Sequence, residues 1–120
     1  NLGRALMENF PFADNGFRLA AAFDVDPELV GKQLSGTQVY HVDAMEDYLK
    51  ENPVSVCVLT VPAGVAEEMA RRVAACGVTG IWNFTNVELP QQDMTGVRVE
   101  DVHFADSLLT LSYMISEEAL

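Results

Sequence analysis

The first residues of the chain and one acidic residue downstream place the strongest constraint on the fold. The chain begins Asn1-Leu2-Gly3-Arg4-Ala5-Leu6, which matches the end of a G-x-G-x-x-G turn as it enters its helix. In that motif the last glycine lets the helix pack closely on a sheet, and an acidic residue about 20 positions later closes the next strand. Asp24 stands 21 positions after Gly3 and follows a largely apolar stretch, residues 17–23. The two features predict a parallel sheet with connecting helices.

Helix-like and strand-like stretches alternate along the rest of the chain. Apolar residues recur at helical spacing in some stretches and run almost continuously in others. The expected helices are 2–10, 43–51 and 65–76, and the expected strands are 17–24, 39–42, 54–60, 80–84 and 97–101. Glu46, three residues after Asp43, fits a capping box at the start of the second helix. The alternation is typical of an α/β protein with a Rossmann-like, doubly wound parallel sheet.

The strand expected at 54–60 and the helix that follows it are the best-defined elements. The strand is nearly continuous in apolar and β-branched residues, which predicts a position near the middle of the sheet with both faces covered. The helix has an apolar stripe on one side, with Glu67–Arg71 and Glu68–Arg72 pairs on the other, and Gly77 ends it. The stripe consists of Ala66, Met69, Ala70 and Val73.

The expected sheet lacks its central strand. In a doubly wound sheet the strand before the glycine turn is flanked on both sides, and its removal exposes two rows of unpaired backbone groups. Neither that strand nor an initiator Met precedes Asn1 in the sequence. We therefore expect a fragment of a longer protein, in which residues 1–103 form a Rossmann domain without its first strand and residues 104–120 form a terminal helix.

The terminal helix, expected from about Phe104, is apolar around much of its circumference. One line of the helix consists of Phe104, Leu108, Leu111 and Ile115, and Ala105, Leu109 and Tyr113 lie beside it. Because one sheet face would not cover so wide a surface, we expect a partner subunit or a missing domain to pack against it. The alternative is a wide helix packed into its own core.

Composition and charge exclude several functional classes. The 120 residues are 49% hydrophobic, which suffices for one core but not for two domains. Neither a signal peptide nor an apolar run of the roughly 20 residues that cross a bilayer is present, so we expect no membrane partner and a cytoplasmic protein. The formal net charge of −11 repels phosphate backbones, so this segment should not itself hold DNA. A pyrophosphate can still bind to backbone N–H groups at a helix N-terminus.

The sequence shows little equipment for catalysis or metal binding. Cys57 falls in an expected strand and Cys76 at a helix end, without the spacing of a metal or disulfide site, so both are expected to be structural thiols. Neither a Ser-Tyr-Lys set nor a His-Asp pair is evident at the expected strand ends. His41 and His103 are expected to be surface or hydrogen-bonded histidines. We therefore expect a binding protein with no catalytic residue and no metal site.

Six segments, in this order and at these separations, resemble the redox-sensing transcriptional repressor Rex. They are Asn1–Leu6, Ala22–Pro27, Val39–His41, Leu59–Ala63, Asn83–Phe84 and Leu111–Tyr113, and the resemblance spans nearly the whole chain. It implies a homodimeric bacterial repressor with an N-terminal winged-helix domain that binds operator DNA. The C-terminal Rossmann domain of such a protein senses the NADH/NAD+ ratio, and its last helix is swapped between subunits. By this resemblance the winged helix and the first Rossmann strand are absent from the chain.

The resemblance also implies a set of contacts with NAD(H). Asn1, Leu2 and Gly3 would hold the pyrophosphate, and Asp24, with Val25 beside it, the adenosine ribose. Phe104 would reach the nicotinamide bound to the partner subunit. The remaining contacts would come from Thr60, Val61, Pro62, Ala63, Asn83 and Phe84. The chain departs from the family at Asn9, where many members carry Tyr, and at His103, where some carry Asp, which leaves the relay to the DNA-binding domain open.

Charge favours NAD(H) over NADP(H). Asp24 would accept hydrogen bonds from a free 2′-hydroxyl, whereas a 2′-phosphate would meet a like charge, and neither Val25 nor Asp26 supplies an arginine. Oxidised nicotinamide is cationic, so an apolar pocket penalises NAD+ and NADH binds more tightly. If NADH also prefers a dimer that misaligns the winged helices, it releases the full-length protein from its operator.

Alternatives remain for single residues and for the function. Asp24 could instead initiate a turn, Pro62 could simply stop a strand, and Asn83 and Asn86 could satisfy turn backbone. Two other functions fit the same glycine turn. One is the nucleotide-binding half of an NAD-dependent oxidoreductase, and the other is a CoA-binding domain.

Overall fold

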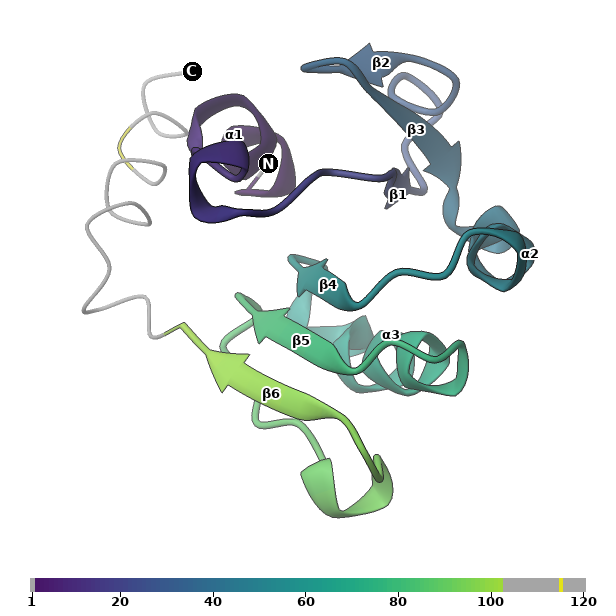
Figure 1. Cartoon of the computed structure of the whole chain (residues 1–120), viewed down its shortest axis with the longest axis vertical. Helices are drawn as coiled ribbons and strands as arrows, with labels where there is room; N and C mark the ends of the chain where they lie inside the picture. Colours follow the sequence, from purple (N-terminus) through teal and green to yellow (C-terminus); the bar gives the residue numbers. More distant parts are fainter. Residues whose placement is uncertain (1, 103–114, 116–120) are drawn as a thin grey trace.

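The structure, a computed structural model, describes residues 2–102 and residue 115, which form an α/β fold (Figure 1). Its strands are β1 (Ala22–Asp24), β2 (Gln33–Leu34), β3 (Thr37–His41), β4 (Val56–Leu59), β5 (Gly80–Asn83) and β6 (Arg98–Asp101). Its α-helices are α1 (Leu2–Asn9), α2 (Met45–Glu51) and α3 (Ala63–Ala75). Three short 3-10 helices are η1 (Ala13–Asn15), η2 (Val42–Ala44) and η3 (Gln91–Asp93).

The strands form two three-stranded sheets, ordered β1-β3-β2 and β4-β5-β6. In the first sheet β1 pairs with β3 in parallel, and in the second β5 pairs in parallel with both of its neighbours. The parallel α/β class is therefore confirmed. The antiparallel hairpin of β2 and β3 was not expected. Its signal is the Ser35-Gly36 pair, whose positive φ angles of 51° and 79° suit a two-residue hairpin turn.

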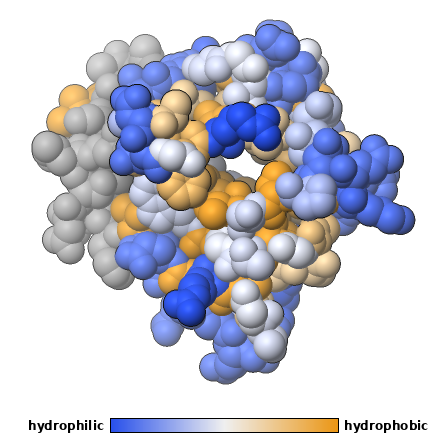
Figure 2. Space-filling view, in the orientation of Figure 1, coloured by the Kyte–Doolittle hydropathy of each residue, from blue (hydrophilic) through white to orange (hydrophobic). Residues whose placement is uncertain are grey.

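The edges of β1 and β4 are not hydrogen-bonded to each other or to another strand within the described residues. Figure 1 shows the two strands on either side of the space between the sheets, and Figure 2 shows a hollow there with apolar side chains along its lower border and a hydrophilic residue above it. Val56 of β4 is 41% exposed, although its strand was expected to be covered on both faces.

Helices cover both faces of the sheets, as a doubly wound fold requires. On one face α2 and α3 share a core with β4 and β5, consisting of Met45, Leu49, Leu59, Ala66, Ala70, Val73, Val78, Ile81, Leu89 and Met94. On the other face α1 packs through Leu2 and Leu6 on Phe84, with Val58 and Trp82 beside them. Leu59 and Val58 enter opposite cores because successive strand residues point to opposite faces.

Helix α3 confirms its expected pattern. Ala66, Ala70 and Val73 are buried, and the two alanines let the helix axis approach the sheet closely. The chain leaves the helix through Gly77, whose φ of 89° lies in the left-handed region that favours glycine. The Glu67–Arg71 pair forms, with 3.0 Å between Nη2 and Oε1.

Several local expectations are wrong or only partly met. The strand expected at 17–24 is limited to its last three residues, β1. The capping box does not form, because α2 begins at Met45 without a side-chain cap and Glu46 instead binds Arg72. The expected terminal helix lies outside the described residues, except that Ile115 is helical and 59% exposed.

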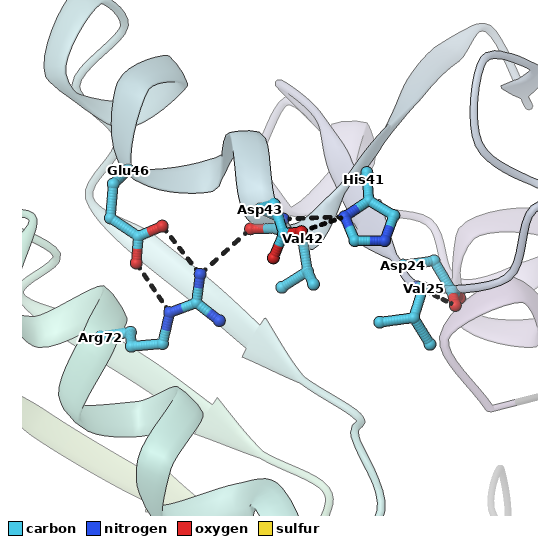
Figure 3. Close-up of polar contacts among 7 residues, drawn as sticks. All are labelled: Asp24, Val25, His41, Val42, Asp43, Glu46 and Arg72. Atoms are coloured by element: carbon cyan, nitrogen blue, oxygen red, sulfur yellow. Dashed lines mark hydrogen bonds and ion pairs between the residues drawn. The ribbon is translucent and has the colours of Figure 1, made fainter.

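Arg72 of α3 connects the two halves of the fold (Figure 3). Its Nε and Nη2 atoms donate to the two carboxylate oxygens of Glu46 at 2.7 and 2.8 Å, and Nη2 also donates to the carbonyl of Val42 at 3.2 Å. The expected partner, Glu68, is not hydrogen-bonded to it. The hydrogen bonds from Arg72 hold the pKa of the Glu46 carboxyl below its ordinary value. The pair therefore stabilises the fold above the pKa that Glu46 has in the unfolded chain.

We predict that Arg72→Met and Glu46→Gln each lower the free energy of unfolding by about 0.5–1 kcal/mol at pH 7, a small value because both side chains are partly exposed and screened. The difference from the parent should shrink as the pH falls through the folded-state pKa of Glu46, because protonation breaks the pair in the parent as well. Chemical denaturation at several pH values measures it. Glu68→Gln is the matched control and should leave stability unchanged, and an equal loss in that variant would contradict the assigned pair.

Candidate functional site

The predicted site residues lie where parallel strands end. The register places Asp24 beside His41, Leu59 beside Asn83, and Asn83 beside Asp101, so the last residues of these strands line one edge of each sheet. Ligands of open α/β sheets bind outside the carboxyl ends of the strands. The structure therefore brings the β1 residues together with His41, and the β4 residues together with those of β5. Asn1 and Phe104 lie outside the described residues.

Asp24 forms a turn and keeps one oxygen available. Its Oδ1 accepts hydrogen bonds from the backbone N–H groups of Val25 at 2.7 Å and Asp26 at 3.0 Å, which is the geometry of an Asx turn. No contact within the described chain occupies the second carboxylate oxygen. The alternative that Asp24 initiates a turn is thus confirmed. The turn holds the carboxylate through Oδ1 and leaves Oδ2 able to accept a hydrogen bond.

The residues after Asp24 combine an exposed apolar side chain with a second acidic turn. Val25 is 66% exposed, which is unusual for a large aliphatic side chain at the end of a strand. The Oδ1 atom of Asp26 accepts from the N–H of Glu28 at 2.9 Å. No basic side chain occurs from Asp24 to Glu28, so this segment itself offers a phosphate carboxylates and no cationic partner.

A histidine–aspartate pair that the sequence did not reveal lies beside Asp24 (Figure 3). His41 Nδ1 is 3.4 Å from Asp43 Oδ2 and accepts a hydrogen bond from the Asp43 N–H at 3.0 Å. In a catalytic His–Asp pair the carboxylate accepts a hydrogen bond from Nδ1–H of the histidine. Here Nδ1 of His41 is itself an acceptor for a backbone N–H, so it cannot donate to Asp43 in that way. The pair caps η2. The sequence feature that could have indicated this pair is the position of His41 at the end of β3. The register with β1 places that strand end beside Asp24.

The segment after β4 turns directly into α3. Thr60 and Val61 are half-buried, whereas Pro62 and Ala63 are exposed. Pro62 precedes the first helical residue with φ −57° and ψ 150°, and α3 begins without a side-chain cap. Pro62 is the N-cap residue of α3, whereas β4 has already ended three residues earlier at Leu59. The exposed residues of the turn are available for contact, and the half-buried ones shape its base.

Asn83 and Phe84 are buried at the end of β5. Asn83 is 2% exposed, and its Nδ2 donates to the Val87 carbonyl and to Asp101 Oδ1, both at 2.8 Å. Its Oδ1 accepts from the N–H of Thr85 at 3.0 Å and from the Thr85 hydroxyl at 2.6 Å. The amide has no remaining hydrogen-bonding capacity. Phe84 packs under α1, so the side chains of both residues support the site from within.

The start of α1 is compatible with an anion. Leu2 is buried against Phe84, Gly3 is half-buried, and the first turn holds no acidic residue. The first N–H groups of a helix carry partial positive charge that favours an anion. At the other end of the helix, Asn9 donates from Nδ2 to the Ala5 carbonyl at 2.8 Å. Asn9 is the last residue of α1 and is exposed.

The remaining candidates for chemistry are inert or absent. Both cysteines are free, and burial raises the pKa of the Cys57 thiol to about 12, well above the range in which a thiolate forms. Burial also raises the pKa of Cys76. Among residues 2–102 and 115 no group of three or more metal-ligating side chains occurs. In the same residues no helix has the length and apolarity to cross a membrane.

Comparison with protein families gives one match. The CoA binding domain family matches residues 1–87. This range runs from α1 to the loop after β5 and so includes Asp24, the segment after β4, and Asn83.

Comparison with individual proteins gives consistent results over the whole chain. A redox-sensing transcriptional repressor Rex from Caldicellulosiruptor saccharolyticus is 45% identical over 120 residues, covering 100% of this chain and 54% of that protein. The crystal structure of RSP, a Rex-family repressor, in complex with β-NADH is 35% identical with a TM-score of 0.81, covering 99% of this chain and 56% of that one. RSP in complex with β-NAD+ and operator DNA has a TM-score of 0.80 at 35% identity, covering 99% and 54%. The chain thus spans about half the length of the proteins it matches, and the resemblance to Rex is confirmed.

We predict that Asp24→Ala lowers the free energy of unfolding by about 1 kcal/mol, because two backbone N–H groups lose their acceptor. Asp24→Asn should cost little, since its side-chain oxygen can accept from the same two groups. Urea denaturation measures both variants, with Asp47→Asn on the exposed face of α2 as a control for the lost charge. Equal losses for the alanine and asparagine variants would contradict the turn.

Proposed function

Because the chain belongs to the CoA binding domain family and is similar along its whole length to Rex repressors, we propose that it is the NADH-sensing part of a transcriptional repressor. The observation that carries this proposal is the carboxylate of Asp24. It is held rigidly at a strand end by two backbone N–H groups, and its second oxygen is without a partner in the described chain.

In this proposal Asp24 accepts hydrogen bonds from the adenosine ribose through that second oxygen. Val25 covers one side of the adenosine with its exposed side chain. The pyrophosphate lies at the start of α1, against Asn1, Leu2 and Gly3, where partial positive charge and the absence of acidic side chains favour it. The remaining contacts come from Thr60, Val61, Pro62, Ala63 and the backbone of Asn83 and Phe84.

The proposed organisation is that of a Rex repressor. Residues 1–103 form the NAD(H)-binding unit, and residues 104–120 form a helix through which two chains dimerise and from which Phe104 reaches the partner's nicotinamide. Operator DNA binds to a winged-helix domain outside this chain. That assignment agrees with a net charge of −11, which makes this segment a poor ligand for DNA. A repressor of bacterial genes works in the cytoplasm.

Sensing in this scheme requires binding and no chemistry. An apolar nicotinamide pocket disfavours the cationic ring of NAD+ and so prefers NADH. NADH then releases operator DNA if it binds more tightly to the dimer form that cannot engage the operator, since a ligand shifts an equilibrium only by its difference in affinity. A role without catalysis agrees with the strand ends around Asp24, where Nδ1 of His41 accepts a hydrogen bond from the backbone N–H of Asp43.

The family match favours CoA as the second candidate ligand. CoA carries a phosphate on the 3′-hydroxyl of its ribose, beside the hydroxyl that Asp24 would bind. All charged side chains from Asp24 to Glu28 are carboxylates, so that phosphate meets like charge from this segment. The same argument disfavours NADP(H), whose phosphate sits on the 2′-hydroxyl.

We predict that NADH binds at least about tenfold more tightly than NADPH or CoA, because a phosphate next to Asp24 costs more than about 1.4 kcal/mol. Asp24→Asn should weaken NADH binding by about tenfold and narrow the difference between NADH and NADPH, since a charged acceptor becomes neutral. Calorimetric titration measures these affinities, with Asp47→Asn as the control. Equal affinity for NADH and NADPH would contradict the role of Asp24, and binding of CoA without NADH would establish the alternative ligand.

A further inference from the structure

Asn83 lies where the ends of three strands meet. Its backbone carbonyl accepts from the N–H of Val102, the residue after β6, at 2.9 Å. The next residue, Phe84, donates its N–H to the Leu59 carbonyl at the end of β4 at 2.9 Å. The Asn83 side chain holds Thr85 and Val87 of the following loop. Asn83 therefore links β5, β6 and the loop 84–87, and its neighbour Phe84 adds the contact to β4. This loop lies at the edge where the nucleotide is proposed to bind.

Asp101 is one of two acceptors, with the Val87 carbonyl, that orient the Asn83 amide. A side-chain amide presents donors on one side and an acceptor on the other, so its orientation decides which neighbours it can bind. The Asp101 carboxylate can only accept, and its Oδ1 lies 2.8 Å from Nδ2 of Asn83. This contact directs the Asn83 oxygen towards the N–H and hydroxyl of Thr85. The Thr85 hydroxyl in turn accepts from the Val87 N–H at 3.3 Å, so the loop is bonded to Asn83 and, through Asn83, to Asp101.

We propose that Asp101 is a positioning residue, which sets the conformation of the loop 84–87 through Asn83 and thereby the affinity for the nucleotide. The link to affinity rests on the proposed function. Asp101 is also the last residue of β6, and Val102 is bonded to Asn83 itself. A ligand that moves the loop therefore acts directly on the chain where it leaves β6.

The test compares three variants at β6 in the full-length protein. Asp101→Ala removes the acceptor, and Asp101→Asn offers an amide oxygen to Asn83 Nδ2 in its place. Glu100→Ala is the matched control, because the side chain of this exposed neighbour points to the opposite face of the strand and makes no hydrogen bond within the described residues. For each variant we would measure NADH affinity by titration, stability by denaturation, and hydrogen exchange at the Thr85 and Val87 amides without nucleotide.

We expect Asp101→Ala to weaken NADH binding by about five- to tenfold, because without this hydrogen bond the loop adopts its binding conformation in only a fraction of the molecules. Asp101→Asn should restore most of the affinity, and Glu100→Ala should keep it. Exchange at Thr85 and Val87 should rise in Asp101→Ala alone. A purely structural role would lower stability and leave NADH affinity within twofold of the parent, which would overturn the proposal, as would equal losses in the alanine and asparagine variants.

Failure of the proposed function would look different. If the parent protein does not bind NADH, the sensing role is wrong, and the exchange data then decide the role of Asp101. Faster exchange at Thr85 and Val87 in Asp101→Ala, restored in Asp101→Asn, would still support control of the loop. Unchanged exchange in all variants would overturn it.

Discussion

Parallel pairing of the strands is the constraint from which the site arises. Because β1 runs parallel to β3, and β4 and β6 run parallel to β5, strand ends far apart in the sequence meet at common edges. Each strand end then requires something to satisfy its last backbone groups and to turn the chain. Asp24, His41, Pro62 and Asn83 do this work locally. The candidate site is therefore a set of turn-forming residues, some of which retain exposed atoms for a ligand.

Much of the fold was predictable because its signals are local. The apolar stripe of α3, the glycine that ends it, and the existence of the strand before it follow from periodicity, and the structure confirms them. The expected central place of that strand is not met within the described residues, where β4 lies at the edge of its sheet. The short β1, the hairpin at Ser35-Gly36 and the start of α2 at Met45 were not predicted. The extent of β1 and of the hairpin depends on pairing with other strands. The start of α2 depends on Glu46, which binds Arg72 and so does not form the expected capping box.

The site was predictable in position but less so in detail. Strand-end rules and the resemblance to Rex place Asp24, Thr60 and Asn83 correctly at sheet edges, since register follows from topology. They could not show that the Asn83 side chain is fully bonded, or that His41 meets Asp43, because such contacts depend on loop geometry that no short motif encodes. The contribution of Asp101 was hidden for the same reason, since 18 residues separate it from Asn83.

The central claim is that the oxygen of Asp24 not used by the turn binds a ribose. A crystal structure of the full-length protein with NADH tests it most directly. Our account predicts that an adenosine ribose hydroxyl lies within about 3 Å of that oxygen, with the Val25 and Asp26 contacts to Oδ1 intact and the pyrophosphate at the start of α1. A ribose bound elsewhere, or Asp24 turned away from the nucleotide, would contradict the account.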